Sequence, residues 1–313
     1  MRAADLTVII VNWNTVDLLD DCLRSVLDYG PAGLSQEIVV VENASSDGSV
    51  EHLRTNWPSV KLIANDENVG FCRANNQAIR VSEAPYLLLI NTDARLRAGC
   101  VNTMLGYLQH DPRAGVVGPR LVYGDGSFQR WTAGQSLSLG SCATYLLGLD
   151  RLAARHQARA GMYLNYDIAE PFKPGWVSSA VMLVRRAALD EIGAFDESIF
   201  VYMDDVDLCQ RATDAGWNTW YAAETTAVHF MGASSRRATG NASPEAFRAL
   251  NRWFERRHGR RAALALRALA TVGFSARACL CLINGLLRTD ATARKRSRDH
   301  WGRVKLCLAG THA

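Results

Sequence analysis

An acidic segment between Gly193 and Arg211 holds the residues of this chain best suited to chemistry. Five acids fall within twelve residues: Asp196, Glu197, Asp204, Asp205 and Asp207. Large apolar side chains surround them. Carboxylates crowded together in apolar surroundings raise one another's pKa and need a cation, a metal or an acidic substrate proton to compensate them. Proton transfer and metal binding are the two kinds of chemistry that such a group supports.

The same segment has a purely structural interpretation. From about Tyr202 it is predicted to be a helix, so Asp204, Asp205 and Asp207 would lie in the first turns, where acids complement the helix dipole. Asp207 and Arg211 are four residues apart and could form an ordinary surface ion pair. The segment alone does not decide between the two, so the elements around it matter.

The first half of the chain predicts an α/β fold. Buried strands are expected at 6–13, 37–42, 60–64 and 86–90, and helices at 17–27, 49–56 and from Asn68 onward. Strands that alternate with helices at this spacing form a right-handed parallel sheet. Ligands of such sheets bind at the carboxyl ends of the strands. Trp13, Glu42, Asn43 and Asp93 all stand at those ends, which predicts a shared ligand site.

The second half is less regular and ends in a basic extension. Further strands are predicted at 115–119, 176–184, 219–222 and 226–230, and a domain boundary near Ser234. Residues 1–235 hold 18 Lys and Arg against 27 Asp and Glu, a balance of −9, whereas residues 236–313 hold 17 against 4, a balance of +13. Such an excess of cations indicates an anionic partner for the extension.

Two helices are predicted in the extension. Pro244–His258 is amphipathic, and Ala262–Leu287 is apolar apart from Arg267 and Arg277. Its longest charge-free stretch is about ten residues, whereas a transmembrane helix needs roughly 20, so we expect it to lie in an anionic membrane surface. The alternative is a helical hairpin packed on the main domain or on a second copy of the chain.

Composition excludes several classes of protein. The apolar content of 48% is that of a globular protein and not of a disordered one. The eight cysteines form no CxxC pair, which argues against a zinc knuckle or a disulfide framework and for reduced thiols. The N-terminus lacks the apolar core of a signal peptide, so we expect a cytoplasmic protein. The basic extension has few aromatic residues to stack on bases, so nucleic-acid binding is not expected.

Six motifs follow one another along residues 5–235. They are Val8–Asn14, Val41–Ser49, Asn68–Phe71, Leu88–Asp93, the acidic segment and His229. Each is weak alone, but their order and spacing resemble the family 2 glycosyltransferases with the GT-A fold, and among them the rhamnosyltransferase-like branch. The resemblance implies a Rossmann-like, mainly parallel central sheet flanked by helices. Its nucleotide-binding half would cover about residues 1–125 and its catalytic half 126–235, followed by the basic helical extension at 236–313.

The resemblance implies a cation that holds the leaving diphosphate of a sugar nucleotide, either Mg²⁺ or Mn²⁺. Asp93 matches the last acid of the family's Asp-x-Asp motif, and Asn91 stands where the first acid is usual. His229 aligns with a histidine that completes the metal site, and imidazole accepts Mn²⁺ more readily than Mg²⁺. A strand histidine satisfied within the fold is the alternative.

The remaining site residues are also implied by the resemblance. Glu42 would accept the imide N–H of the base, Trp13 would stack on the base or pack in the core, and Asp47 would bind the nucleotide or cap a helix. Arg73 would contact the diphosphate, and residues 234–237 could close over it. The expected donor-binding residues are Val11, Trp13, Glu42, Asn43, Asp47, Arg73, Asn91 and Asp93.

The acceptor side completes the expected site. Asp205 matches the catalytic base, with Asp204 in place of the more usual glutamate, and Trp176 and Ser179 would line the acceptor. A base must lie within hydrogen-bond reach of the acceptor hydroxyl, opposite the leaving diphosphate. The expected activity is an inverting, metal-dependent transfer of L-rhamnose from dTDP-rhamnose to a lipid-linked or growing glycan at the inner membrane face. UDP-hexose or UDP-galactofuranose donors, or a catalytically silent sugar-nucleotide-binding subunit, are the alternatives.

Overall fold

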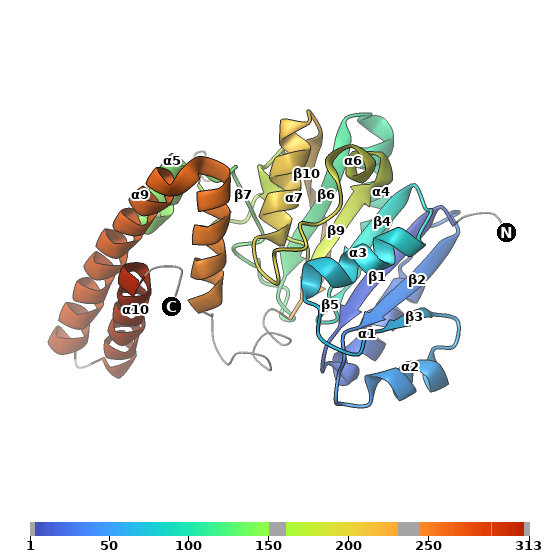
Figure 1. Ribbon diagram of the computed structural model, residues 1–313, viewed down its shortest axis with the longest axis horizontal. Helices are drawn as coiled ribbons and strands as arrows, with labels where there is room; N and C mark the ends of the chain where they lie inside the picture. Colours follow the sequence, from blue (N-terminus) through green and yellow to red (C-terminus); the bar gives the residue numbers. More distant parts are fainter. Residues whose placement is uncertain (1–3, 150–160, 231–243, 289, 310–313) are drawn as a thin grey trace. The chain divides into compact units, whose positions relative to one another are not determined.

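The computed structural model describes residues 4–149, 161–230, 244–288 and 290–309, which form two compact units (Figure 1). The sheet unit comprises Met1–Gly134 and Tyr166–Asn241, and the helical unit comprises Gln135–Asn165 and Ala242–Ala313. The expected boundary near Ser234 and the expected lid at 234–237 lie outside the described residues. Residues 135–165 join the helical unit, a difference from the continuous domain expected over 1–235, because helix α5 (Leu139–Leu146) packs on helix α9 (Pro244–Leu287).

The sheet unit is built on one mixed, mainly parallel sheet. Its strands lie in the order β3-β2-β1-β4-β9-β6-β10-β5. Their bounds are β1 Leu6–Asn12, β2 Gln36–Glu42, β3 Lys61–Ala64, β4 Tyr86–Ile90, β5 Ala94–Arg95, β6 Ala114–Val122, β9 Val181–Arg185 and β10 Asn218–His229. Strands β9 and β5 run antiparallel to their neighbours, and the other pairs are parallel.

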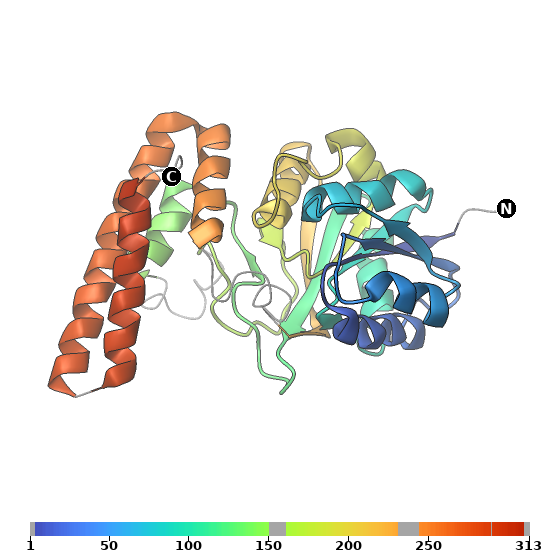
Figure 2. The ribbon, with the colours of Figure 1, turned by 60° about the horizontal axis from the view of Figure 1, so that its bottom comes forward.

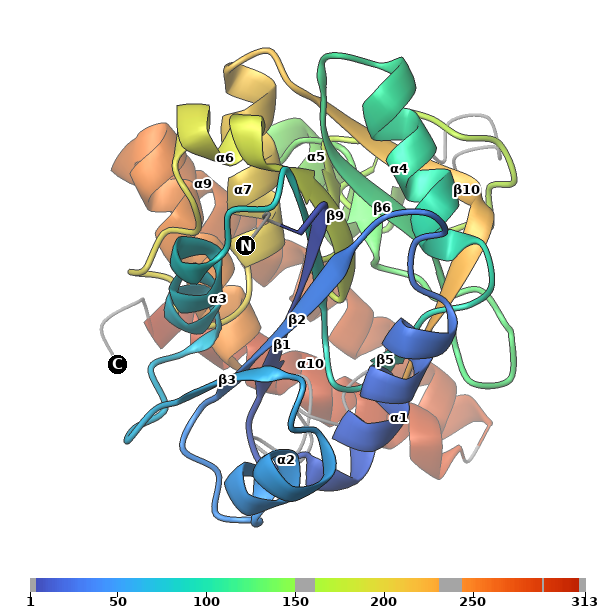
Figure 3. The ribbon, with the colours of Figure 1, turned by 90° about the vertical axis from the view of Figure 1, so that its right-hand side faces the viewer.

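Helices cover both faces of the sheet, as the view along it shows (Figure 3). Helices α1 (Val16–Asp28), α2 (Ser49–Asn56) and α4 (Cys100–His110) pack on the face that carries Val8, Val40 and Leu88. Helices α3 (Phe71–Val81), α6 (Arg186–Ile192) and α7 (Asp204–Asp214) cover the opposite face. Burial on both faces explains why the strands read as continuous apolar runs. The predicted strands and helices of residues 6–90 are therefore confirmed.

Two predictions in the second half were wrong in detail. The strand expected at 176–184 is two strands, β8 (Trp176–Val177), which pairs with β7 (Ala133–Gly134), and β9, which enters the main sheet. A turn separates them, in which the Ser178 Oγ accepts from the Ala180 N–H at 3.2 Å. Conversely, the strands expected at 219–222 and 226–230 are one strand, β10, whose pairing with β6 is irregular between Ala222 and Thr226.

The helical unit is a small bundle. Helix α9 is broken at Gly259, which has φ of 83° and ψ of 165°, so the amphipathic helix predicted at 244–258 ends where it was expected to end. The second half of α9 and helix α10 (Ala291–Ala309) lie side by side (Figure 2). The Arg267 Nε donates to the Cys307 carbonyl at 2.9 Å, and the Ser297 Oγ donates to the Ala278 carbonyl at 2.8 Å, so the pair is an antiparallel hairpin.

The apolar part of α9 is longer than its charge-free stretches indicated. An 18-residue window within Glu245–Leu287 has a mean hydropathy of 1.6, and 28% of that window is buried. By length and composition alone this helix could cross a membrane, contrary to the expectation that it is too short. The core helix of a soluble protein can have the same length and composition, so these properties alone do not make α9 a membrane span.

Candidate functional site

Sheet pairing brings Asp93 and His229 together at the carboxyl edge of the sheet. Strand β5 begins directly after Asp93 and pairs with the end of β10, where His229 lies opposite Ala94. The His229 Nε2 is 3.3 Å from the Asp93 Oδ1, and both side chains are largely buried. The His229 Nδ1 is 2.8 Å from the Gln129 Oε1, while the Gln129 Nε2 donates to the His229 carbonyl at 3.0 Å.

This arrangement suits a divalent cation. Because the Gln129 oxygen accepts from the protonated Nδ1, the neutral imidazole keeps a lone pair on Nε2, on the side of the Asp93 carboxylate. A carboxylate oxygen and an imidazole nitrogen at this separation fit two adjacent ligands of one ion. Among the described residues no third His, Cys, Asp or Glu joins them, so the other ligands would be donor phosphates and water.

The acid pair stands at the start of α7, after a strained turn. Tyr202 and Met203 have φ of 65° and 69°, in the left-handed region that β-carbons disfavour, at a cost of about 1–3 kcal/mol each. Asp204 and Asp205 follow directly as the first two residues of the helix. The Ser179 Oγ donates to the Asp204 Oδ2 at 2.6 Å, and the Val206 N–H donates to the Asp205 Oδ1 at 2.8 Å.

Burial makes both acids hold their protons more tightly. Desolvation, followed by the charge of the neighbouring Asp204, raises the pKa of Asp205 to about 8. Hydrogen bonds from the backbone N–H groups of Val206 and Ser179 stabilise the charged form and partly oppose this rise. Desolvation also raises the pKa of Asp204, although the hydrogen bond from Ser179 opposes it. Below about pH 8 Asp205 therefore carries its proton in most molecules, and only its charged form can accept a proton.

A hydrogen-bonded network joins the ends of β1, β2 and β4. The Thr15 Oγ1 donates to the Asn12 Oδ1 at 2.8 Å and is 2.9 Å from the Thr92 Oγ1. Glu42 is fully buried, and its carboxylate accepts from the Ser45 N–H at 3.1 Å and from the Ser45 hydroxyl. Glu42 thus lies at the expected strand end, where its carboxylate orders the loop after β2.

Two other residues predicted to bind the nucleotide, Asn43 and Asp47, form hydrogen bonds that hold neighbouring loops and helix starts in this structure. The Asn43 Oδ1 accepts from the Val69 N–H at 3.1 Å and from the Asn65 amide at 3.1 Å. The Asp47 carboxylate accepts from the Val16 N–H at 2.9 Å and from the Ser49 N–H at 3.1 Å, so it caps α1 and α2. Burial raises the pKa of Asp47, but the hydrogen bonds from Ser49 and Val16 outweigh this effect and hold the pKa below its ordinary value.

The remaining predicted residues divide between the sheet edge and α3. Val11, Trp13 and Asn91 are partly exposed at the strand ends, and the Asn91 N–H donates to the Ala180 carbonyl at 3.0 Å. Trp176 is buried in β8. Arg73 is half exposed on the first turn of α3, where its Nε is 3.4 Å from the Glu197 Oε2.

Sequence reasoning missed two partners of these residues. Gln129 fixes the His229 ring, and Asn76 on α3 binds the loop before the acid pair. Ser179 was expected on the acceptor side, and the structure adds its bond to Asp204. Gln129 lies in an irregular segment where no periodicity marks it. The one available signal was the pair Asn75 and Asn76, polar residues on the otherwise buried side of a predicted helix.

Comparison with known proteins places the sheet unit in a known group. The family model "Glycosyl transferase family 2" matches residues 7–193. The N-acetylglucosaminyl-diphospho-decaprenol L-rhamnosyltransferase of Mycobacterium tuberculosis is 29% identical over 212 residues, which cover 64% of this chain and 68% of that protein. Glycosyltransferase AglE of Haloferax volcanii is 24% identical over 302 residues, 93% of this chain and 88% of AglE.

Solved structures share the fold. The mannosyltransferase PcManGT from Pyrobaculum calidifontis, in complex with GDP-Man and Mn²⁺, has a TM-score of 0.59 at 16% identity, over 99% of this chain and 88% of that one. GalNAc-T7 with UDP, GalNAc and Mn²⁺ has a TM-score of 0.53 at 14% identity, over 73% of this chain and 44% of that one. The GT-A fold predicted from the sequence is confirmed.

The raised pKa of Asp205 predicts how its replacement changes stability. A carboxyl whose pKa rises on folding, from 3.8 to about 8, stabilises the fold below its unfolded pKa, and this contribution is lost as the pH rises through the folded value. The neutral Asp205→Asn variant should therefore gain melting temperature over the wild type at about pH 8 and show a smaller gain at about pH 5. Differential scanning calorimetry at the two pH values measures both differences.

Asp207→Asn is the matched control, because Asp207 lies on the same helix turn but pairs with the Arg211 Nε at 2.8 Å. It should show no gain that grows with pH. An Asp205→Asn gain that is equal at both pH values would contradict the pKa of the buried pair.

Proposed function

Since the chain belongs to the family 2 glycosyltransferases, we propose that it transfers a sugar from a nucleoside diphosphate to a glycan, with inversion at the anomeric carbon and with help from a divalent cation. The approach of the His229 Nε2 to the Asp93 Oδ1, in the tautomer fixed by Gln129, is the observation that carries the metal-dependent form of this proposal. The acid pair at the start of α7 would supply the base that an acceptor hydroxyl needs.

The acid pair performs the proton transfer. The acceptor oxygen forms a bond to the anomeric carbon while the bond from that carbon to the diphosphate breaks and its electron pair leaves with the diphosphate. The hydroxyl proton passes to Asp205, which is partly exposed, whereas Asp204 is buried and tied to Ser179. In its charged form, whose population grows as the pH approaches 8, Asp205 takes the proton as the acceptor hydroxyl becomes acidic in the transition state.

Asp93 and His229 would hold the cation. When bound, a divalent ion neutralises the charge that develops on the leaving diphosphate. Gln129 keeps the His229 ring oriented, as partners of metal-binding histidines commonly do. The resident ion is Mg²⁺ or Mn²⁺, and Mn²⁺ is favoured by the imidazole ligand and by its presence in both structural neighbours.

The donor is proposed to be dTDP-L-rhamnose and the acceptor a lipid-linked or growing cell-surface glycan. The likeness to a mycobacterial rhamnosyltransferase supports this choice. UDP-hexose and UDP-galactofuranose remain the competing donors of the same fold. A silent sugar-nucleotide-binding subunit is disfavoured, because such a protein has no need for a proton-accepting acid pair beside a cation site.

A panel of sugar nucleotides tests the proposal. dTDP-rhamnose with Mn²⁺ should raise the melting temperature of the purified protein more than UDP-galactose or UDP-galactofuranose, because only a bound ligand stabilises by mass action. Asp93→Ala and His229→Ala should lose the Mn²⁺-dependent part of this shift, and Gln129→Ala should weaken Mn²⁺ affinity by about 10- to 100-fold. A His229→Ala titration identical to the wild type would remove the histidine from the metal site.

Replacement of the base separates binding from chemistry. Asp205→Asn should lower turnover by about 10²-fold or more while donor affinity stays close to that of the wild type, because the base acts on the acceptor. Radiolabelled sugar transfer and calorimetric donor titration measure the two quantities. Full transfer activity in this variant would assign the base elsewhere.

The helical unit is proposed to bind an anionic membrane surface. Large apolar side chains near the end of α9 are exposed, and α10 carries six basic residues. The exposed apolar residues are Leu280, Leu282, Ile283, Leu286 and Leu287. The basic residues of α10 are Arg294, Lys295, Arg296, Arg298, Arg303 and Lys305. Apolar side chains that insert beside cations that face lipid headgroups are typical of interfacial anchors. The excess of basic charge supports an anionic surface, such as the inner face of the cell membrane, over a second copy of this chain.

Vesicle co-sedimentation tests the membrane proposal on the full chain. The wild type should bind vesicles that contain anionic lipid, and salt should weaken the binding only partly, because each basic residue contributes about 1 kcal/mol that salt screens while apolar insertion persists. The double variant Leu286→Ser/Leu287→Ser should lose the salt-resistant part. Leu27→Ser, which removes an exposed leucine of the sheet unit, is the control.

Equal salt-resistant binding of the wild type and the double variant would show that Leu286 and Leu287 do not insert, and no binding by either would favour oligomerisation through this face. Retention of the wild type after alkaline extraction of the vesicles would show that α9 spans the bilayer.

A further inference from the structure

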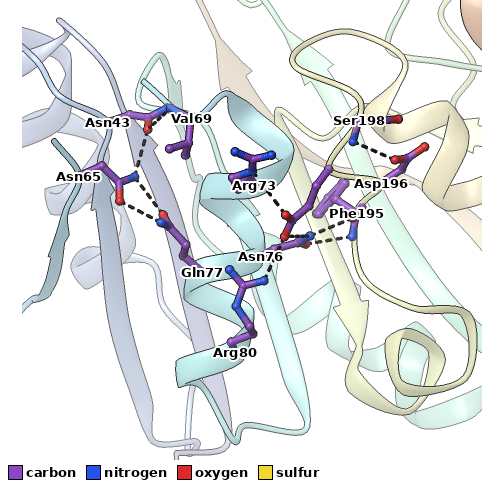
Figure 4. Close-up of polar contacts among 11 residues, drawn as sticks. Asn43, Asn65, Val69, Arg73, Asn76, Gln77, Arg80, Phe195, Asp196 and Ser198 are labelled. Carbon is purple, nitrogen blue, oxygen red and sulfur yellow. Dashed lines mark hydrogen bonds and ion pairs between the residues drawn. The ribbon is translucent and has the colours of Figure 1, made fainter. Parts of the chain in front are cut away.

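The side chain of Asn76 holds the loop that leads to the acid pair (Figure 4). Its Oδ1 accepts from the Phe195 N–H at 3.0 Å, and its Nδ2 donates to the Phe195 carbonyl at 2.8 Å. The same Nδ2 donates to the Glu197 Oε1 at 3.1 Å. One buried amide thus satisfies both backbone groups of one loop residue, an arrangement that only an amide side chain of this length provides here.

Two arginines of α3 complete this attachment. Arg73 and Arg80 lie on the same face of the helix as Asn76, one turn to either side, and both pair with Glu197, at 3.4 Å and 3.0 Å. Glu197 therefore receives an amide and two guanidinium groups from one helix. Exposed ion pairs of this kind are weak alone, so the buried Asn76 amide is the stronger contact.

The loop is attached to α3 a second time, just before the acids. The Phe71 N–H, at the start of the helix, donates to the Phe200 carbonyl at 2.8 Å. Gly70, with φ of 85°, permits this approach, because a β-carbon there would lie 2.6 Å from the Phe200 ring. Residues 195–200 are thus held at both ends on two turns of α3.

The strained turn follows this attached loop. Tyr202 and Met203 adopt left-handed conformations that persist only when the surrounding structure imposes them. Freeing the loop would remove a constraint that precedes this turn. The contacts of α3 with residues 195–200 hold the chain just before the turn, and the hydrogen bond from Ser179 to Asp204 holds it just after.

We propose that Asn76 is a positioning residue for Asp204 and Asp205: its amide fixes the loop before the strained turn and so keeps the two carboxyls side by side, with Asp204 buried and Asp205 only partly exposed. The other titratable groups that face the pair are Asp207 and Cys209 on α7, Cys72 on α3 and Asp196 in the loop. None of these contacts Asn76 through its side chain in the described hydrogen bonds, so replacing Asn76 acts on the pair through the loop.

Asn75 offers a matched control. It is the adjacent residue on α3, it is equally buried, and its Nδ2 donates to the Phe71 carbonyl of its own helix at 2.9 Å. Asn75→Ala and Asn76→Ala therefore remove the same side chain from the same helix. Only the second removes a contact with the loop.

A substrate-free titration tests the proposal independently of the transfer reaction. In protein labelled at the aspartate carboxyl carbons with ¹³C, the signal that disappears in Asp205→Asn reports the titration of Asp205, with a midpoint near 8 in the wild type. In Asn76→Ala the midpoint should fall by about one pH unit or more as water reaches the pair, and in Asn75→Ala it should stay unchanged. An Asn76→Ala midpoint equal to that of the wild type would overturn the proposal.

Kinetics provide the second measurement, which rests on the proposed transferase function. Asn76→Ala should lower kcat by about 10²-fold with donor KM within about twofold of the wild type, because misplacement affects the base and not donor binding. If the wild type transfers no sugar, the proposed function fails while the titration still decides the role of Asn76. If Asn76→Ala does not fold by circular dichroism, Glu197→Ala replaces it, and an unchanged Asp205 midpoint in that variant counts against the proposal.

Discussion

Two neighbouring carboxyls held largely out of water, Asp204 and Asp205, impose the main constraint on the sheet unit. Charged carboxylates in such a place repel each other and lose hydration, so the fold must either supply donors or let the pair keep a proton. It does both. The Ser179 hydroxyl and the N–H groups at the start of α7 donate hydrogen bonds to the pair. These donors do not fully replace the lost hydration, so the pKa of Asp205 is raised. The same loss of hydration makes the charged form of Asp205 a strong proton acceptor.

The two halves of the site are positioned by different physical means. Asp93 and His229 are fixed by backbone pairing of β5 with β10, in which each hydrogen bond supports the next. The acid pair stands outside the sheet, on a helix reached through a loop and two strained residues. A ladder holds its register without help from side chains, whereas a loop needs specific side-chain contacts. This difference explains why amides and arginines concentrate on α3.

Local patterns in the sequence were enough to predict the sheet and to place Trp13, Glu42 and Asp93 at its carboxyl edge, because strand ends follow from strand limits. The meeting of Asp93 with His229 joins residues far apart in the chain, and only the resemblance to a family indicated it. The hydrogen-bond partners of the site residues could not be predicted from the sequence. The side chains of Asn43 and Asp47, predicted to bind the nucleotide, accept from backbone N–H groups of neighbouring turns, and sequence cannot separate the two roles because the same polar groups serve both. Gln129 and Asn76 show their roles only once the backbone they contact is known.

The helical unit shows how a count of charges can mislead about a helix. Arg267 and Arg277 interrupt the apolar sequence of α9, which suggested a stretch too short to cross a membrane. In the folded hairpin the guanidinium of Arg267 donates to the carbonyls of Cys307 and Leu308, and that of Arg277 donates to the carbonyl of Tyr145. Their charge is thus directed toward backbone oxygens inside the unit, and leucines such as Leu280 and Leu286 occupy exposed positions. A guanidinium group that is hydrogen-bonded within the unit adds little charge to the exposed surface of its helix. The exposed surface of α9 is therefore more apolar than the composition of its sequence indicates.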